Sequence, residues 1–171
     1  RTDSSAASDV YKRQVFAEPA PENCWRIIVA IADVSTYVQS GDILDKEARQ
    51  RGNSVYLPGT VVPMLPEALS NGLCSLRPHE DRACLAVEMI IDSAGNKQSH
   101  KFFQALIRSS ARLTYTLVQQ VIEGSLDEAD CKVTPGTLHH LIGAFHTLHK
   151  SRNRRGTLTV SYTHLTLPTN L

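Results

Sequence analysis

The middle of the chain alternates between short apolar runs and segments with helical spacing. Residues 25–32 form a continuous apolar run that is rich in β-branched side chains, which predicts a buried strand. Residues 85–91 and 101–107 predict two further strands. The turn-forming sequence at 92–96, Asp-Ser-Ala-Gly-Asn, lies between them, so we expect these two strands to form a hairpin.

Three segments have helical patterns. Residues 43–51 follow Asp42, a favourable N-cap, and precede Gly52, a favourable C-cap. Thr114 can cap a second helix that runs to about residue 123. The longest pattern, at 137–154, places apolar residues three and four positions apart: Leu138, Leu141, Ile142, Phe145 and Leu148. Together these elements predict an α+β fold with mixed strands and packed helices.

The segment from Asn53 to Leu76 follows neither pattern. Its three prolines fix φ and remove backbone donors, and its two glycines permit turns. Loops of this length are usually functional or disordered, and the many apolar residues here argue against disorder. We therefore expect an ordered, irregular loop.

Composition and charge limit the class of protein and its location. A chain of 171 residues with 42% hydrophobic content suits one globular domain, and its net charge of +1 gives no global basic field. The four cysteines form no CxxC pair, so we expect free thiols and a reducing, cytoplasmic location. No apolar run is long enough for a membrane span or a signal core, so no membrane partner is expected.

The two ends differ from the middle. Residues 1–14 lack periodicity, and residues 160–171 alternate without an evident partner; both resemble translated sequencing-adapter DNA. The chain also begins with Arg rather than Met, which suggests a fragment. We expect non-native flanks at 1–14 and 160–171, with a partial domain at 15–159 between them. Ordinary flexible tails are the alternative.

Several separate strings carry a family resemblance. They are Ala-Ile-Ala-Asp-Val-Ser at 30–35, the long loop at 53–76, and Ala-Arg-Leu-Thr-Tyr at 111–115. In this order and spacing they resemble the catalytic RNB domain of the ribonuclease II and ribonuclease R family, and more closely its ribonuclease R branch. The resemblance covers nearly all of the chain outside the two flanks, and because several unrelated strings agree it is specific.

The resemblance implies a 3′-to-5′ exoribonuclease that hydrolyses single-stranded RNA to nucleoside 5′-monophosphates with Mg²⁺, acts as a monomer and does not bind membranes. In the family an acidic motif ending in Asp-Asp-Ala precedes the strand that begins here at Val15. This chain has Lys12, Arg13 and Gln14 at those positions, and Asp3 and Asp9 fall out of register. We therefore assign no catalytic or metal-binding residue, and we expect this fragment to bind no Mg²⁺ and to be inactive.

Two tyrosines are the candidate RNA-binding residues. Tyr56 matches a family tyrosine that stacks on a nucleotide near the RNA 3′ end, and an aromatic ring can stack on any base. From the sequence alone, the alternative is that Tyr56 fills the interior of the loop. Tyr115 matches a family tyrosine near the RNA path, and packing at a helix start is an equal alternative for it.

Other polar residues are weaker candidates. Arg77, Arg82, Arg108 and Arg112 could contact phosphates, although surface or ion-paired roles are commoner. Asp33 could approach a metal, but a turn or cap role fits it better. Cys74 lacks a paired histidine base, so we interpret it as a buried thiol. Histidines 139, 146 and 149 lack an acidic or cysteine ligand at matching spacing, so we expect no zinc site.

Two alternatives remain beside the exoribonuclease. The parent protein could be a non-catalytic, RNA-binding relative, which the presence or absence of aspartates before Val15 in the full gene would decide. The chain could also be a fragment with no independent function, and a cooperative unfolding transition would argue against that.

Overall fold

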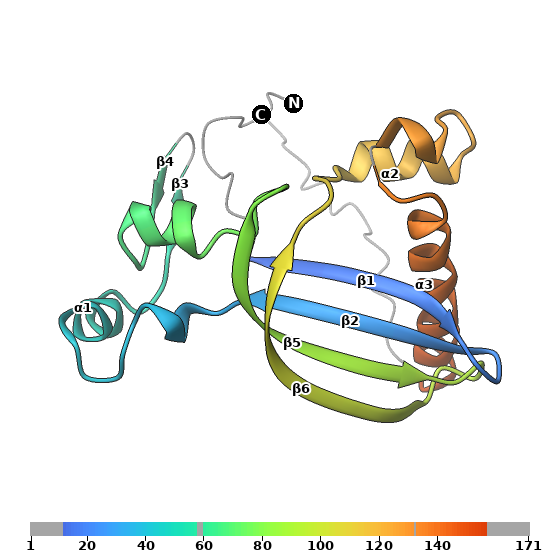
Figure 1. The fold of residues 1–171 in the computed structure, drawn as a ribbon, viewed down its shortest axis with the longest axis horizontal. Helices are drawn as coiled ribbons and strands as arrows, with labels where there is room; N and C mark the ends of the chain where they lie inside the picture. The colour runs from blue at the N-terminus through green and yellow to red at the C-terminus, as the bar shows by residue number, and fades with distance from the viewer. Residues whose placement is uncertain (1–11, 58–59, 132, 157–171) are drawn as a thin grey trace, which may run out of the picture.

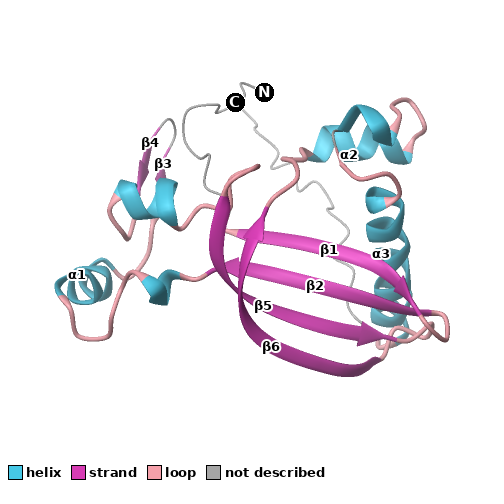
Figure 2. Ribbon diagram, viewed as in Figure 1, coloured by secondary structure: helices cyan, strands magenta, loops and turns pink. Residues whose placement is uncertain are grey.

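The computed structural model describes residues 12–57, 60–131 and 133–156. Its main feature is a four-stranded antiparallel sheet in the order β1-β2-β5-β6, with helices at its ends (Figure 1, Figure 2). The sheet strands are β1 Arg13–Ala20, β2 Cys24–Ala32, β5 Asp81–Ile91 and β6 Lys97–Arg108. A separate hairpin consists of β3 Val55–Leu57 and β4 Thr60–Val62. The helices are α1 Ile43–Arg51, α2 Tyr115–Ile122 and α3 Thr137–Arg154. The α+β prediction is confirmed.

One face of the sheet packs against α3. Strand residues alternate between faces, and Ala17, Ile27 and Ile91 are buried together with Ala144 of the helix. Trp25 of β2 also links the sheet to α3, because its indole Nε1 donates a hydrogen bond of 3.1 Å to Oγ1 of Thr147. This packing fixes α3 across one end of the sheet (Figure 1).

The opposite face packs against the chain that follows the hairpin. Cys74 and Leu76 are buried there against small residues of β2 and β5, which are Ala30, Ala32, Cys84 and Ala86. Burial raises the pKa of the Cys74 thiol and of the Cys84 thiol. The four cysteines are free thiols, as predicted, and Cys74 is a buried one.

The predicted helices agree closely with the structure. Asp42 accepts a hydrogen bond from the amide of Asp45, and Gly52 ends α1 with φ +76°. Thr114 caps α2 by accepting from the amide of Leu117. Within the described part of the chain, no helix combines the length and hydropathy that a bilayer crossing needs.

The strands differ more from the prediction. β5 begins at Asp81 rather than at residue 85, and β6 runs from Lys97 to Arg108 rather than from 101 to 107. The extra pairing includes Asp81 and Arg108, which form a two-point ion pair with distances of 2.7 and 2.9 Å. A pattern of hydrophobic residues cannot predict strand ends that are formed by charged residues such as these.

The loop at 53–76 also contains more regular structure than predicted. It includes the β3–β4 hairpin and a short π-helix at Ala68–Leu73. Strands of three residues are shorter than any alternation that a sequence pattern can establish.

Candidate functional site

Tyr56 lies at the middle of β3, opposite Val61 of β4. Its side chain is 72% exposed, and the neighbouring Val55 and Leu57 are also exposed. This exposure rules out the alternative that Tyr56 fills the interior of the loop. An exposed phenol ring is a suitable surface for stacking on a nucleobase.

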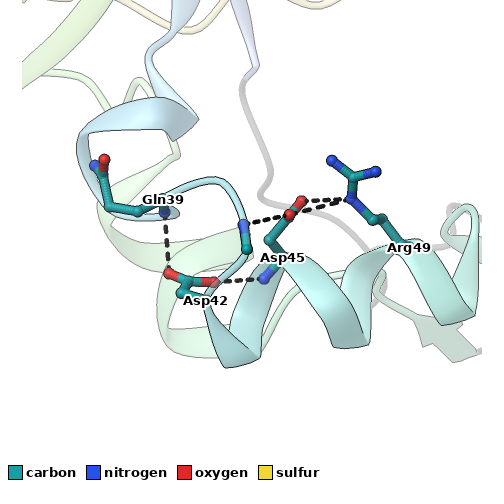
Figure 3. A network of polar contacts seen from close by, with 5 residues as sticks. Gln39, Asp42, Asp45 and Arg49 are labelled. Atoms are coloured by element: carbon teal, nitrogen blue, oxygen red, sulfur yellow. Dashed lines mark hydrogen bonds and ion pairs between the residues drawn. The ribbon is translucent and has the colours of Figure 1, made fainter.

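The hairpin follows α1, which has a tightly bonded N-terminus (Figure 3). Asp42 accepts from the amides of Asp45 and Gln39, at 2.6 and 3.0 Å. Asp45 in turn accepts from the amide of Gly41 at 2.8 Å and from Arg49 at 3.1 Å. The bond from the Asp45 amide satisfies a donor that the first helical turn would otherwise leave unpaired, and the other two amides belong to the chain that leads into the helix. The bonds that Asp45 accepts hold the pKa of its carboxyl below its usual value, the Gly41 amide contributing most.

Tyr115 is the first residue of α2, directly after its cap Thr114. Its side chain is 99% exposed, so it does not pack at the helix start. Helix α2 lies at the other end of the sheet from the β3–β4 hairpin (Figure 1). The structure therefore does not bring Tyr56 and Tyr115 together.

Lys12 and Arg13 stand at the two positions where the resemblance places metal-binding aspartates. Arg13 is the first residue of β1 and pairs with Ile31. Nζ of Lys12 donates to the backbone carbonyls of Ser70 and Cys74, at 2.7 and 3.3 Å. Burial lowers the pKa of the Lys12 ammonium, and the nearby Cys74 partly opposes this.

These residues do not fit a Mg²⁺ site. A hard cation needs carboxylate or other oxygen ligands, whereas Lys12 offers only donors and already engages the nearby carbonyl oxygens. Among the described residues, no three His, Cys, Asp or Glu side chains gather closely enough to hold a metal ion. Asp3 and Asp9 lie outside the described residues.

Asp33 is a capping residue. Its carboxylate accepts from the amide and hydroxyl of Ser35, at 3.0 and 2.5 Å, and from Nε2 of Gln104 at 3.1 Å. The hydroxyl of Ser35 is the main reason why the pKa of this buried carboxyl lies below its usual value. The predicted turn or cap role is confirmed.

Three of the four candidate arginines bond within the chain. Arg77 donates to the carbonyl of Asn71 at 2.7 Å, and Arg108 pairs with Asp81. Arg82 donates to the carbonyl of Ser75 at 3.1 Å and also contacts Glu80. These bonds favour the structural alternative for Arg77, Arg82 and Arg108.

Arg112 lines a small cavity that the sequence did not indicate. The cavity has a volume of about 150 Å³ and also includes Arg13, Gln14 and Ser109. Oε1 of Gln14 is buried and has no hydrogen-bond partner among the described residues.

Two of the candidate histidines of α3, His146 and His149, contact the aromatic ring of Phe145. Phe145 stacks on His149 with ring centroids 5.4 Å apart, and it also contacts His146 at 5.6 Å.

Sequence reasoning missed two residues at the base of the hairpin. Oγ of Ser54 accepts from the amide of Met64 at 2.9 Å, and Nη1 of Arg51 donates to the carbonyl of Pro63 at 3.0 Å. Pro63 is the sequence signal for such residues, because a proline next to a paired strand interrupts the backbone hydrogen bonds and leaves nearby groups for side chains to bond.

Comparison with known proteins gives consistent matches. The model of the RNB domain matches residues 2–169. Ribonuclease R of Vibrio parahaemolyticus is 47% identical over 146 residues, which make up 84% of this chain and 17% of that protein. Ribonuclease R of Escherichia coli is 46% identical over 144 residues, which make up 83% of this chain and 18% of that protein.

A solved structure agrees with these matches. Mycoplasma genitalium RNase R in complex with ribose-methylated single-stranded RNA superimposes with a TM-score of 0.82 and 33% identity, covering 91% of this chain and 24% of that one. The chain thus spans less than a fifth of the length of the two curated relatives and about a quarter of the solved one. From its sequence and its fold, the chain belongs to the RNB domain family and is homologous to ribonuclease R.

Proposed function

We propose that the chain is the substrate-holding part of the catalytic domain of a 3′-to-5′ exoribonuclease. The parent protein would hydrolyse single-stranded RNA to nucleoside 5′-monophosphates in the cytoplasm, as a monomer. Membership of the RNB family and homology to ribonuclease R support this proposal. The acidic motif that would hold Mg²⁺ in the parent has no counterpart among the residues described here.

The exposed ring of Tyr56 is the observation that carries the proposal. It stands on a hairpin beyond the body of the sheet (Figure 2), and Tyr56 is 72% exposed to solvent. Stacking of a base on an aromatic side chain contributes about 1–3 kcal/mol and tolerates any sequence. Tyr115, with its 99% exposed side chain, is a second proposed contact farther along the RNA.

We also propose that this polypeptide does not hydrolyse RNA. Two cations stand where two carboxylates should bind the metal, and the Lys12 ammonium is held in place by the carbonyls of Ser70 and Cys74. A fixed positive charge at that place repels Mg²⁺. The second candidate function, a non-catalytic RNA-binding relative of the family, concerns the parent protein, and the presence or absence of aspartates before Val15 in the full gene decides it.

RNA binding tests the proposed function. Fluorescence anisotropy of a labelled single-stranded oligoribonucleotide gives Kd for the 171-residue chain and for Tyr56→Leu. We expect Tyr56→Leu to weaken binding at least about fivefold, because it removes the stacking surface but keeps apolar area. Leu57→Ala, which alters an exposed neighbour without an aromatic ring, is the matched control. Equal affinities for the wild type and Tyr56→Leu would overturn the proposal.

A further inference from the structure

The β3–β4 hairpin has little internal support. It has three residue pairs, Val55 with Val62, Tyr56 with Val61, and Leu57 with Thr60. Most of its large apolar side chains are exposed to solvent. A two-stranded hairpin of this kind is marginally stable by itself in water. Contacts at its base must therefore determine how it is oriented.

The backbone ladder cannot continue toward that base. The residue after Val62 is Pro63, which has no amide hydrogen to donate. Two side chains bond the backbone groups that follow. Oγ of Ser54 accepts from the amide of Met64 at 2.9 Å, and Nη1 of Arg51 donates to the carbonyl of Pro63 at 3.0 Å. We call Ser54 and Arg51 the hairpin clamp.

The hairpin clamp connects the hairpin to α1. Arg51 is the last residue of α1, and its Nε also bonds to Oε1 of Glu47 at 2.9 Å, one turn earlier. The helix ends at Gly52, whose φ of +76° turns the chain toward β3. The guanidinium thus connects the last turn of α1 to Pro63, the residue directly after β4.

We propose that Ser54 and Arg51 are positioning residues that fix the orientation of Tyr56 for stacking on RNA. This inference rests on the proposed function, because it assigns the clamp a role in the same site. Ser54 has the larger effect, since its bond is partly buried, whereas the guanidinium of Arg51 is exposed and its ion pair is screened by solvent. Neither side chain needs to touch the RNA.

Fluorescence of 2-aminopurine tests the proposal. The probe is placed at the 3′ end of a single-stranded oligoribonucleotide, where stacking on an aromatic ring changes its emission. With the 171-residue chain, we expect Ser54→Ala to bind about threefold to tenfold more weakly, as suits loss of one hydrogen bond, and to change the probe's emission less at saturation. Ser54→Thr keeps the hydroxyl and should restore both signals. Ser40→Ala, at an exposed serine before α1, is the matched control.

The Tyr56 and Ser54 variants together separate failure of the positioning role from failure of the proposed function. If Tyr56→Leu weakens binding but Ser54→Ala behaves like the wild type, the positioning role is wrong and the proposed function stands. If Ser54→Thr fails to rescue while the melting temperatures of both variants fall equally, the serine has a purely structural role and the inference is also overturned. If Tyr56→Leu has no effect, the proposed function fails. In that case the positioning role fails with it, and faster amide exchange at Met64 in Ser54→Ala than in Ser54→Thr would show only that Ser54 holds the base of the hairpin.

Discussion

The turn between β5 and β6 lies close against α3, and Gly95 is the residue that permits this contact. Gly95 has φ +80°, and a Cβ built on it would overlap Cβ of Ser151 and lie 2.8 Å from the carbonyl oxygen of Thr147. Gly95→Ala should therefore combine two costs. A left-handed backbone costs an alanine about 1–2 kcal/mol, and overpacking costs about 1–3 kcal/mol more. We expect unfolding to become easier by about 2–5 kcal/mol in total.

Gly124→Ala separates the two costs. Gly124 has φ +72° but nothing within 4 Å of its built Cβ, so it should show the backbone cost alone, about 1–2 kcal/mol. Urea denaturation, followed by the fluorescence of Trp25, measures both variants. Trp25 is the single tryptophan of the chain and bonds to Thr147 of α3, so its emission reports this packing. Equal destabilisation by the two substitutions would refute the close approach of the turn and the helix.

Three further results are expected. Thr147→Val should cost about 1 kcal/mol in urea denaturation by removing the acceptor of the Trp25 indole, and an unchanged midpoint would contradict this. The pKa of Asp33 is lower in the folded state than in the unfolded state, so its carboxylate stabilises the fold above the unfolded carboxyl pKa of about 3.9. This stabilisation is lost as the pH falls through the folded-state pKa. Asp33→Asn should therefore reduce the loss of stability in acid, which urea midpoints from about pH 7 to pH 3 measure. Phe102→Lys with Leu106→Lys should reduce concentration-dependent light scattering, because these side chains are 64% and 70% exposed, and equal scattering would argue against an adhesive apolar surface.

The helices could be predicted from the sequence because their signals are local. Asp42, Gly52 and Thr114 each act within one turn of the helix that they begin or end, so a short stretch of sequence contains the whole interaction. The strands depend on partners far away in the chain. The extension of β5 to Asp81 rests on Arg108, which no local pattern connects to it.

The candidate site could be predicted only in part. The family resemblance indicated Tyr56, but its exposure depends on a hairpin of three-residue strands that no periodicity announces. The sequence shows Lys12 where the resemblance places an aspartate, but it does not show the contacts of Lys12, because Ser70 and Cys74 lie 58 and 62 positions away. The hairpin clamp could not be predicted, because the sequence does not show that Ser54 and Arg51 lie beside Pro63 and Met64 in the folded chain.

An RNA degradation assay tests whether the chain holds RNA without cleaving it. The purified 171-residue chain is incubated with Mg²⁺ and a 5′-labelled single-stranded RNA, and the products are resolved by length in a denaturing gel. We predict that the RNA keeps its full length at protein concentrations where anisotropy shows it to be bound. Mg²⁺-dependent shortening from the 3′ end would contradict the claim that the chain holds substrate without the carboxylates that cleave it.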